Sequence, residues 1–221
     1  MIDKRVKDVA AAVAGIKDGA TLLFAGFGAV GEPVELIQAL IESGVRNLTV
    51  ACNNSGTGDV GLAKLIKERR VRKIICSFPR TSDSHCFEEA YAEGAIELEL
   101  VPQGTLSERM RAAGAGIGAF YTRTSAGTKL AAGKETRVFD EKEYVLERPL
   151  KADAALIKAL KSDRWGNLVY RKSARNFNPV MAMAADLVIA QVKEIVPLGA
   201  LDPETIVTPS IFVDRIVEVE T

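Results

Sequence analysis

The chain has 221 residues, 48% of them hydrophobic and 26% charged, which is enough to form one substantial core. Lysine and arginine together number 29, as do aspartate and glutamate, so the formal net charge is zero and no long-range field would attract nucleic acid or an anionic membrane. Segment 1–24 interleaves charges with short apolar runs, so we expect no signal peptide and no membrane span, and a single cytoplasmic domain covering residues 1–221.

Short apolar runs alternate with amphipathic segments in the first half of the chain, a pattern typical of a parallel α/β sheet. Strands are predicted at "TLLFAG" from Thr21, "NLTVAC" from Asn47, "RKIICSF" from Arg72 and "AIELELV" from Ala95. They recur roughly every 25 residues, a spacing that fits strand-helix-strand units. The pattern therefore predicts an α/β fold built on an open, mostly parallel sheet.

Helices are expected between these strands. The segment "EPVELIQALIESG" places Pro33 near a first helical turn and ends at Gly44, and segments 58–70 and 84–94 are weaker helices of the same kind. After segment 102–128 the pattern loosens, and we expect a long stretch rich in loops. Apolar runs then return at "ADAALIKAL", "NLVY", "DLVIAQV" and "IFVDRIVEV".

A glycine turn follows the first predicted strand in "FAGFGAVGEP", where Gly26, Gly28 and Gly31 match the GxGxxG pattern of dinucleotide-binding proteins. That fingerprint also needs an acid at the end of the next strand, to accept hydrogen bonds from the ribose hydroxyls. Asn53 and Asn54 occupy that place instead. Dinucleotide binding is therefore disfavoured against two alternatives: a turn chosen for packing, or a turn that lines a pocket for another anionic or thioester ligand.

Ordinary catalytic groups are scarce. The only histidine, His85, has no GxSxG elbow to accompany it, and "SDSHCF" indicates a surface or capping histidine with Ser84 as a helix cap. Cys52, Cys76 and Cys86 form no CxxC pair, which indicates buried apolar thiols in a reducing compartment and no metal site.

A pair of acids in the fourth predicted strand does not indicate a catalytic site either. Glu97 and Glu99 alternate along a predicted strand and so share one face, which we expect to be a solvated face rather than a catalytic carboxylate pair.

Neutral hydrogen-bond donors do gather at the predicted ligand-binding edge of the sheet. Asn53 and Asn54 end the second strand, and Gln103 follows the fourth, with the backbone N–H groups of Gly104 and Thr105. Ligands bind at the carboxyl ends of the strands in an open α/β sheet, and amides there are suited to a carbonyl or carboxylate oxygen that gains negative charge. No convincing nucleophile accompanies them, so the chain provides half of an active site.

Five long motifs make the sequence similar to one enzyme family. They are "DGATLLFAGFGAVGEP", "ACNNSGTGDVGL", "ELELVPQGTLSERMRAAGAGIGAFYT", "FDEKEYVLERPLKADAALIKA" and "GNLVYRKSARNFNP". Together they resemble the A (alpha) subunit of the two-subunit 3-oxoacid CoA-transferases of family I, over essentially the whole chain. The resemblance implies a CoA-transferase (NagB/RpiA-like) fold with helices on both faces of the sheet.

This family uses a glutamate that attacks an acyl-CoA, and the glutamate lies in a serine-glutamate-asparagine-glycine motif of the B subunit. No such motif occurs here. The resemblance therefore implies a B-subunit partner, in a heterodimer or heterotetramer. It also implies transfer of CoA from succinyl-CoA to a 3-oxoacid such as 3-oxoadipate, with CoA as co-substrate and no further cofactor.

By matching position, Asn53, Asn54 and Gln103 correspond to polar groups around the substrate. The residues that match the family's glycine-rich loop near CoA are Phe24, Ala25, Gly26, Phe27, Gly28, Ala29 and Val30. A stand-alone module that binds acyl-CoA or a sugar phosphate without chemistry is the alternative, since it too would lack a nucleophile.

Two positions depart from the family pattern. Ala25 replaces a glycine, which predicts strain of about 1 kcal/mol if that backbone needs a positive φ. Glu32 stands at a position where the family tends to have an uncharged residue, and we expect its carboxylate to interact favourably with the dipole of the helix that follows. Arg80, Arg123 and Arg175 are candidates to bind a second substrate carboxylate, although each is individually more typical of a surface residue.

Overall fold

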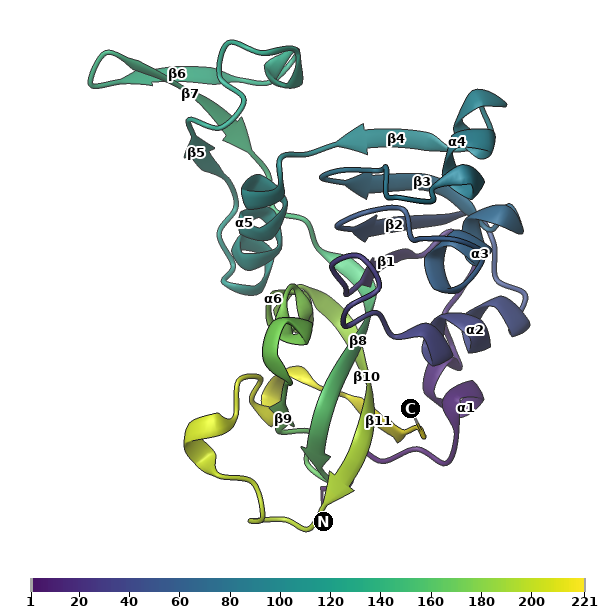
Figure 1. Ribbon diagram of the computed structural model, residues 1–221. Coiled ribbons are helices and arrows are strands. Elements are labelled where there is room, and N and C mark those ends of the chain that lie inside the picture. The colour runs from purple at the N-terminus through teal and green to yellow at the C-terminus, as the bar shows by residue number, and fades with distance from the viewer. Residues whose placement is uncertain (1, 221) are drawn as a thin grey trace.

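A computed structural model describes residues 2–220 and contains an eight-stranded main sheet (Figure 1). Seven of its strands follow the order β11-β10-β8-β1-β2-β3-β4, and every neighbouring pair in that path is parallel. The short strand β9 pairs antiparallel with β8. The bounds are β1 Thr21–Phe24, β2 Leu48–Cys52, β3 Val71–Cys76, β4 Glu97–Leu100, β8 Ala152–Asp163, β9 Leu168–Val169, β10 Ala185–Val196 and β11 Arg215–Glu218. The prediction of an open, mostly parallel sheet is confirmed.

The strand order reverses at β1. Strands β2, β3 and β4 follow β1 in one direction, whereas β8, β10 and β11 continue from its other side. The loop at the carboxyl end of β1 therefore lies at a topological switch point, where open α/β sheets bind their ligands.

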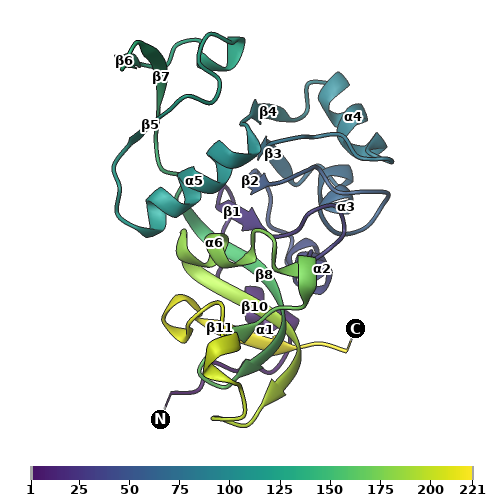
Figure 2. The same ribbon diagram turned by 60° about the vertical axis from the view of Figure 1, so that its left-hand side comes forward.

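Helices cover both faces of the sheet, as expected (Figures 1 and 2). Side chains of α1 to α4 pack in one core cluster, and those of α5 and α6 pack in the other. The bounds are α1 Val9–Val13, α2 Val34–Glu42, α3 Gly61–Lys67, α4 His85–Ala92, α5 Gln103–Gly114 and α6 Asn178–Met183. Short 3₁₀ helices are η1 Lys129–Ala131, η2 Lys172–Arg175, η3 Pro203–Thr205 and η4 Ser210–Phe212.

The apolar run in β1 is explained by burial on both sides. Leu22 and Phe24 belong to the cluster under α1 to α4, whereas Leu23 and the following Ala25 belong to the cluster under α5 and α6. A strand covered on both faces needs a continuous apolar sequence rather than an alternating one. This is why "TLLF" marks the centre of the sheet.

The expectation of a long loop-rich stretch after residue 128 is wrong, because residues 136–139 and 142–147 form strands, and a helix that the sequence did not predict precedes it at 103–114. Residues 103–114 form α5, and β5 (Phe120–Thr122), β6 (Thr136–Phe139) and β7 (Lys142–Glu147) form a separate antiparallel sheet in the order β5-β7-β6. Leu106 and Met110 are the large side chains that α5 buries, one turn apart. Two such residues among glycines and polar residues give too weak a period to recognise in the sequence.

The three-stranded sheet extends away from the main sheet (Figure 1). All four residues of β6 are exposed. That the chain forms one domain over residues 1–221 stays a prediction. Among the described helices, none has the length and apolar character needed to cross a membrane.

Candidate active site

The glycine turn leaves β1 at the carboxyl edge of the sheet, beside β8. Ala25 N donates to Leu156 O at 3.2 Å, so the strand pairing continues to the first residue of the turn. Gly26, Gly28 and Gly31 have φ values of 136°, 60° and 76°, which only glycine adopts without strain. Ala25 is not among the described residues with positive φ, so the strain expected there is absent.

The turn is closed on itself and held from outside. Phe27 N and Val30 O lie 3.0 Å apart, and Val30 N donates back to Phe27 O at 3.3 Å. Asn176, directly after η2, donates from Nδ2 to Val30 O at 2.9 Å. A Cβ atom at Gly31 would lie 2.6 Å from Ala174 O, so the turn and this segment are in close contact. The geometry of the turn therefore depends on residues far along the chain.

Asn53 is buried at the end of β2, and its amide has a defined orientation. Its Oδ1 accepts hydrogen bonds from Ser77 Oγ at 2.8 Å and from Gln103 Nε2 at 2.8 Å. Its backbone oxygen accepts from the N–H groups of Ser77 and Phe78, both at 3.2 Å. Because the acceptor oxygen is occupied twice, Nδ2 is the atom left to donate, and within residues 2–220 it has no hydrogen-bond partner.

Asn54 is oriented by its own loop. Its Oδ1 accepts from Gly56 N at 3.0 Å, which fixes the side chain in a local turn. The structure thus joins two of the three predicted polar residues, Asn53 and Gln103, in one hydrogen bond, and places Asn54 beside them without a bond to either.

Gln103 is the first residue of α5 and not a strand-end residue in a loop. The N–H groups of Gly104 and Thr105 are first-turn amides, which have no acceptor within the helix. Thr105 Oγ1 is also buried, without a hydrogen-bond partner in the described part of the chain. The predicted donors are present, but a helix N-terminus supplies them.

A small pocket of about 10 Å³ brings the glycine turn and the asparagine pair together. Of the predicted site residues, those that line it are Phe24, Ala25, Gly26, Gly28, Asn53 and Asn54. Phe27, Ala29, Val30 and Gln103 are not part of its lining. Phe27 and Val30 instead expose 54% and 48% of their surface at the same edge. The predicted loop therefore has one side facing the pocket and one side facing outward.

Glu32 also lines this pocket, and the expectation that its carboxyl interacts with the dipole of α2, the helix that follows it, is wrong. Glu32 is 8% exposed, and its Oε1 accepts from Leu62 N at 2.9 Å, in the first turn of α3. Burial raises the pKa of its carboxyl, against the opposing effects of the Leu62 N–H and of Lys158. The carboxyl does serve a helix N-terminus, but that of a different helix.

The cysteines are free and buried, as predicted. Burial raises the pKa of Cys76 to about 12 and raises that of Cys52 well above its usual range, so neither supplies a thiolate near neutral pH. Burial also raises the pKa of Cys86. In the described part of the chain, no group of three or more His, Cys, Asp or Glu residues could hold a metal ion.

His85 is a surface residue, as predicted, at the first position of α4. A hydrogen bond to Asp83 raises its pKa, with Nδ1 lying 2.7 Å from Asp83 Oδ1. Ser84 is the residue before α4, but its hydroxyl donates to Glu88 and makes no capping bond.

Glu97 and Glu99 are engaged in ion pairs. Lys73 Nζ lies 3.0 Å from Glu97 and 2.9 Å from Glu99, and Arg109 lies 2.8 Å from Glu99. Partial burial would raise the pKa of Glu99, but the hydrogen bonds from Arg109 and Lys73 outweigh it and lower the pKa. The two acids therefore form ion pairs with neighbouring cations at the surface of the sheet and do not form an acid-base pair.

The three candidate arginines lie on separate segments. Arg80 is exposed in the loop before α4, where it pairs with Glu88 at 3.5 Å, and Arg123 follows β5. Arg175 ends η2, next to the Asn176 that holds the glycine turn. Of the three, Arg175 therefore lies in the segment that contacts the predicted site.

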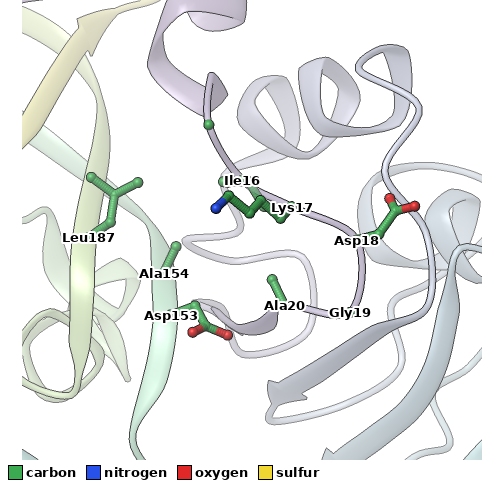
Figure 3. Close-up of a pocket in the computed structure, with 9 residues that line it drawn as sticks. Ile16, Lys17, Asp18, Gly19, Ala20, Asp153, Ala154 and Leu187 are labelled. Atoms are coloured by element: carbon green, nitrogen blue, oxygen red, sulfur yellow. The ribbon is translucent and has the colours of Figure 1, made fainter.

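A larger pocket, of about 410 Å³, lies at the opposite edge of the sheet (Figure 3). The loop 15–20 lines it, together with Asp153, Ala154 and Leu187 at the amino ends of β8 and β10. None of the predicted site residues is among its lining.

Sequence reasoning missed two residues of the site. Ser77 orients Asn53, and its position directly after β3 could have indicated this, because polar residues at strand ends meet at the same edge. Asn176 holds the turn from 146 residues away, and no local pattern in the sequence marks such a contact.

The chain matches known proteins along nearly its whole length. Residues 6–219 match the family model described as coenzyme A transferase. The chain is 61% identical over 221 residues to the A component of 3-oxoadipate CoA-transferase from Acinetobacter baylyi, covering all of this chain and 97% of that protein. It is 60% identical over 219 residues to the Pseudomonas putida protein of the same name, covering 99% of this chain and 95% of the relative.

Solved structures share the fold. The apoenzyme of an acyl-CoA transferase from Escherichia coli O157:H7 superposes with a TM-score of 0.86 at 24% identity, over 98% of this chain and 47% of that one, so this chain spans about half of its length. Glutaconate coenzyme A-transferase from Acidaminococcus fermentans gives a TM-score of 0.88 at 18% identity, over 98% and 76%. The chain belongs to the coenzyme A transferase family, as its motifs predicted.

Proposed function

We propose that this chain is the A component of a 3-oxoacid CoA-transferase that moves CoA from succinyl-CoA to 3-oxoadipate. The observation that carries the proposal is the amide of Asn53 beside the glycine turn. Its oxygen is occupied by Ser77 and Gln103, and its nitrogen is left as a donor at the pocket. The names of the relatives that are 61% and 60% identical support the choice of reaction.

The proposed reaction requires stabilisation of negative charge on a carbonyl oxygen. A B-subunit glutamate attacks the thioester carbonyl of succinyl-CoA and expels the CoA thiolate, which leaves a mixed anhydride. The thiolate then attacks the glutamyl carbonyl and releases succinate, and 3-oxoadipate collects the CoA by the same two steps in reverse. Each attack creates an oxyanion, and the Asn53 N–H₂ group is a preorganised donor for it.

The partner would supply the nucleophile and the opposite wall of the site. Three large apolar side chains are exposed at this edge of the sheet, namely Phe27, Val30 and Phe78, and Phe78 exposes 65% of its surface. An apolar rim around a polar pocket is typical of a surface that another protein covers. We include a heterodimer or heterotetramer with the B subunit in the proposal.

The substrate and the setting are further parts of the proposal. CoA acts as a co-substrate, and no additional cofactor is required. Three free cysteines support a reducing compartment, and hence a cytoplasmic location. A dicarboxylic 3-oxoacid needs a cation for its second carboxylate, and Arg175 is the candidate whose segment contacts the glycine turn.

Reconstitution with the B subunit tests the proposal. Purified together, the two chains should form 3-oxoadipyl-CoA from succinyl-CoA and 3-oxoadipate, whereas this chain alone should form none. Replacing the B-subunit glutamate by alanine provides the matched control. Substantial transfer by the isolated chain would contradict the divided site. Saturable acyl-CoA binding without transfer in the complex would favour a binding module instead.

A further inference from the structure

The carboxyl of Glu32 lies between the glycine turn and α3, two segments that have no other side-chain hydrogen bond between them in the described structure. Glu32 follows Gly31 in the chain, yet its Oε1 accepts from Leu62 N at 2.9 Å. The N-cap of α3 is Val60, whose side chain makes no capping bond. The first turn of a helix has backbone N–H groups without an intrahelical acceptor, so Glu32 supplies the cap that α3 lacks.

The backbone of α3 is shaped to admit this carboxyl. Gly61 has a φ of 52°, and a Cβ atom there would lie 2.4 Å from Glu32 Oε1 and 2.8 Å from Glu32 Cδ. Any residue but glycine at position 61 would therefore displace the carboxyl. The pairing of a buried acid with a glycine facing it indicates a specific contact rather than a chance burial.

The start of α3 is in turn joined to the loop that carries the asparagine pair. A Cβ atom at Gly56 would lie 2.5 Å from Ala63 N, so the backbone of Gly56 packs directly on the first turn of α3. Gly56 N is the donor that orients Asn54 Oδ1. A continuous series of contacts thus runs from Glu32 through the start of α3 to the side chain of Asn54.

We propose that Glu32 is a positioning residue of the site: its carboxyl fastens the glycine turn to the N-terminus of α3 and so holds both walls of the pocket at a fixed separation. Both walls, Gly26 and Gly28 on one side and Asn53 and Asn54 on the other, line the same pocket as Glu32. The effect on catalysis rests on the proposed transferase function, whereas the contact itself does not.

Four variants measured in the complex with the B subunit test the proposal. Glu32→Ala removes the carboxyl that makes the contact. Gly61→Ala retains Glu32 but displaces its carboxyl from the start of α3. Each should lower kcat roughly tenfold with little change in KM for succinyl-CoA, because small misplacements of donors act on the transition state. The double variant should lose no more than either single one, since both remove the same contact. Glu32→Gln keeps an acceptor oxygen and should retain kcat to within about twofold.

Gly58→Ala is the matched control for the backbone. Gly58 lies in the same loop with a φ of 66°, but a Cβ atom there would meet nothing closer than Asp83 Oδ2 at 3.7 Å. Gly58→Ala should introduce the backbone strain of an alanine at positive φ without lowering kcat. Independent, multiplying losses of kcat in Glu32→Ala and Gly61→Ala would overturn the proposal. A Glu32→Gln variant as slow as Glu32→Ala would overturn it too.

Unfolding of the full chain separates this proposal from the proposed function. Gly61→Ala should lower the melting temperature more in the wild-type background than in the Glu32→Ala background, where only the backbone strain is left. Equal shifts in the two backgrounds would overturn the contact whatever the enzyme does. If wild-type complexes transfer no CoA but the unfolding cycle shows coupling, the proposed function fails and the positioning contact stands.

Discussion

The two edges of the main sheet hold pockets of opposite character. The pocket at the amino edge is the larger, at about 410 Å³ against about 10 Å³, yet its two carboxylates already have backbone partners. Asp18 Oδ1 accepts from Arg46 N at 2.9 Å, and Asp153 Oδ2 accepts from Thr21 N at 2.7 Å. At the carboxyl edge, in contrast, protein contacts occupy the acceptor of Asn53 and leave its donor available.

On the proposed function, the smaller of the two pockets is the active site. At the amino edge, one oxygen of each carboxylate holds a backbone N–H group at or just before the start of a strand, that of Thr21 for β1 and that of Arg46 for β2. The carboxyl edge lies at the switch point beside β1, where strand ends from both directions expose groups that no neighbouring strand can satisfy. The proposed site is therefore marked by its place at the switch point and by the free donor of Asn53, and not by its volume.

The sharpest test of this difference compares one side chain at each edge. Gln103→Ala should lower kcat of the reconstituted enzyme roughly a hundredfold, because it releases the Asn53 amide that we propose as the oxyanion donor. Gln103 is exposed, so the variant should fold normally. Lys17→Ala, in the larger pocket, should leave kcat unchanged. Equal rates for the two variants would remove the distinction between the edges.

Substrate choice sharpens the assignment of the carboxyl edge. Arg175→Ala should lower kcat/KM for 3-oxoadipate roughly tenfold and leave transfer to acetoacetate unaffected, since acetoacetate lacks the second carboxylate that a guanidinium pairs with. Arg123→Ala is the control, because that residue follows the separate three-stranded sheet. An equal loss of kcat/KM with both acids would show that Arg175 supports the fold of the turn and does not bind the second carboxylate of the substrate.

The orphaned hydroxyl of Thr105 offers a smaller test. An unsatisfied buried polar group costs stability, so Thr105→Val should raise the free energy of unfolding by about 1 kcal/mol. Denaturant unfolding measures this, with Thr105→Ser, which keeps the hydroxyl, as the control. Destabilisation by the valine would mean that the hydroxyl has a partner in solution. A gain in stability with a drop in kcat would instead give the hydroxyl a role toward substrate.

The smallest expected effect concerns pH. Because burial raises the pKa of Glu32 in the folded chain, its contribution to stability is present below the unfolded pKa and is lost as pH rises through the folded pKa. Glu32→Gln should therefore be more stable than wild type at pH values above the folded pKa of Glu32, and equally stable in acid. Lys158 and Cys52 are the titratable groups that interact with this carboxyl. Melting curves from acid to neutral pH measure the difference, and a constant offset would contradict it.

Much of the fold could be read from the sequence because local signals agree with it. The strand "TLLF" is apolar throughout since both faces are buried, and Pro33 marks the start of α2. Helix α5 was missed because its two large buried residues, Leu106 and Met110, give too short a pattern. Of the site, Asn53, Asn54 and Gln103 follow from the rule of strand ends. Their residue-level roles remain predictions.

The rest of the site depends on contacts between distant residues. Glu32 was expected to act on the helix beside it in sequence, but three-dimensional packing brings it to Leu62. No periodicity or motif in the sequence indicates that contact or the one from Asn176 to Val30. Each joins segments that come close together only in the folded chain. Local sequence patterns cannot reveal such pairs.

The hydrogen bond from Asn176 to Val30 has a consequence for synthesis on the ribosome. The glycine motif is among the first segments to emerge, but the strand β8 that borders β1 and the side chain that closes the turn are made more than a hundred residues later. A nascent chain, or a fragment ending before residue 176, would contain the whole motif and the bonds between Phe27 and Val30, but not the hydrogen bond that holds the turn from outside. The turn is thus completed only late in translation, when the second half of the sheet joins the first.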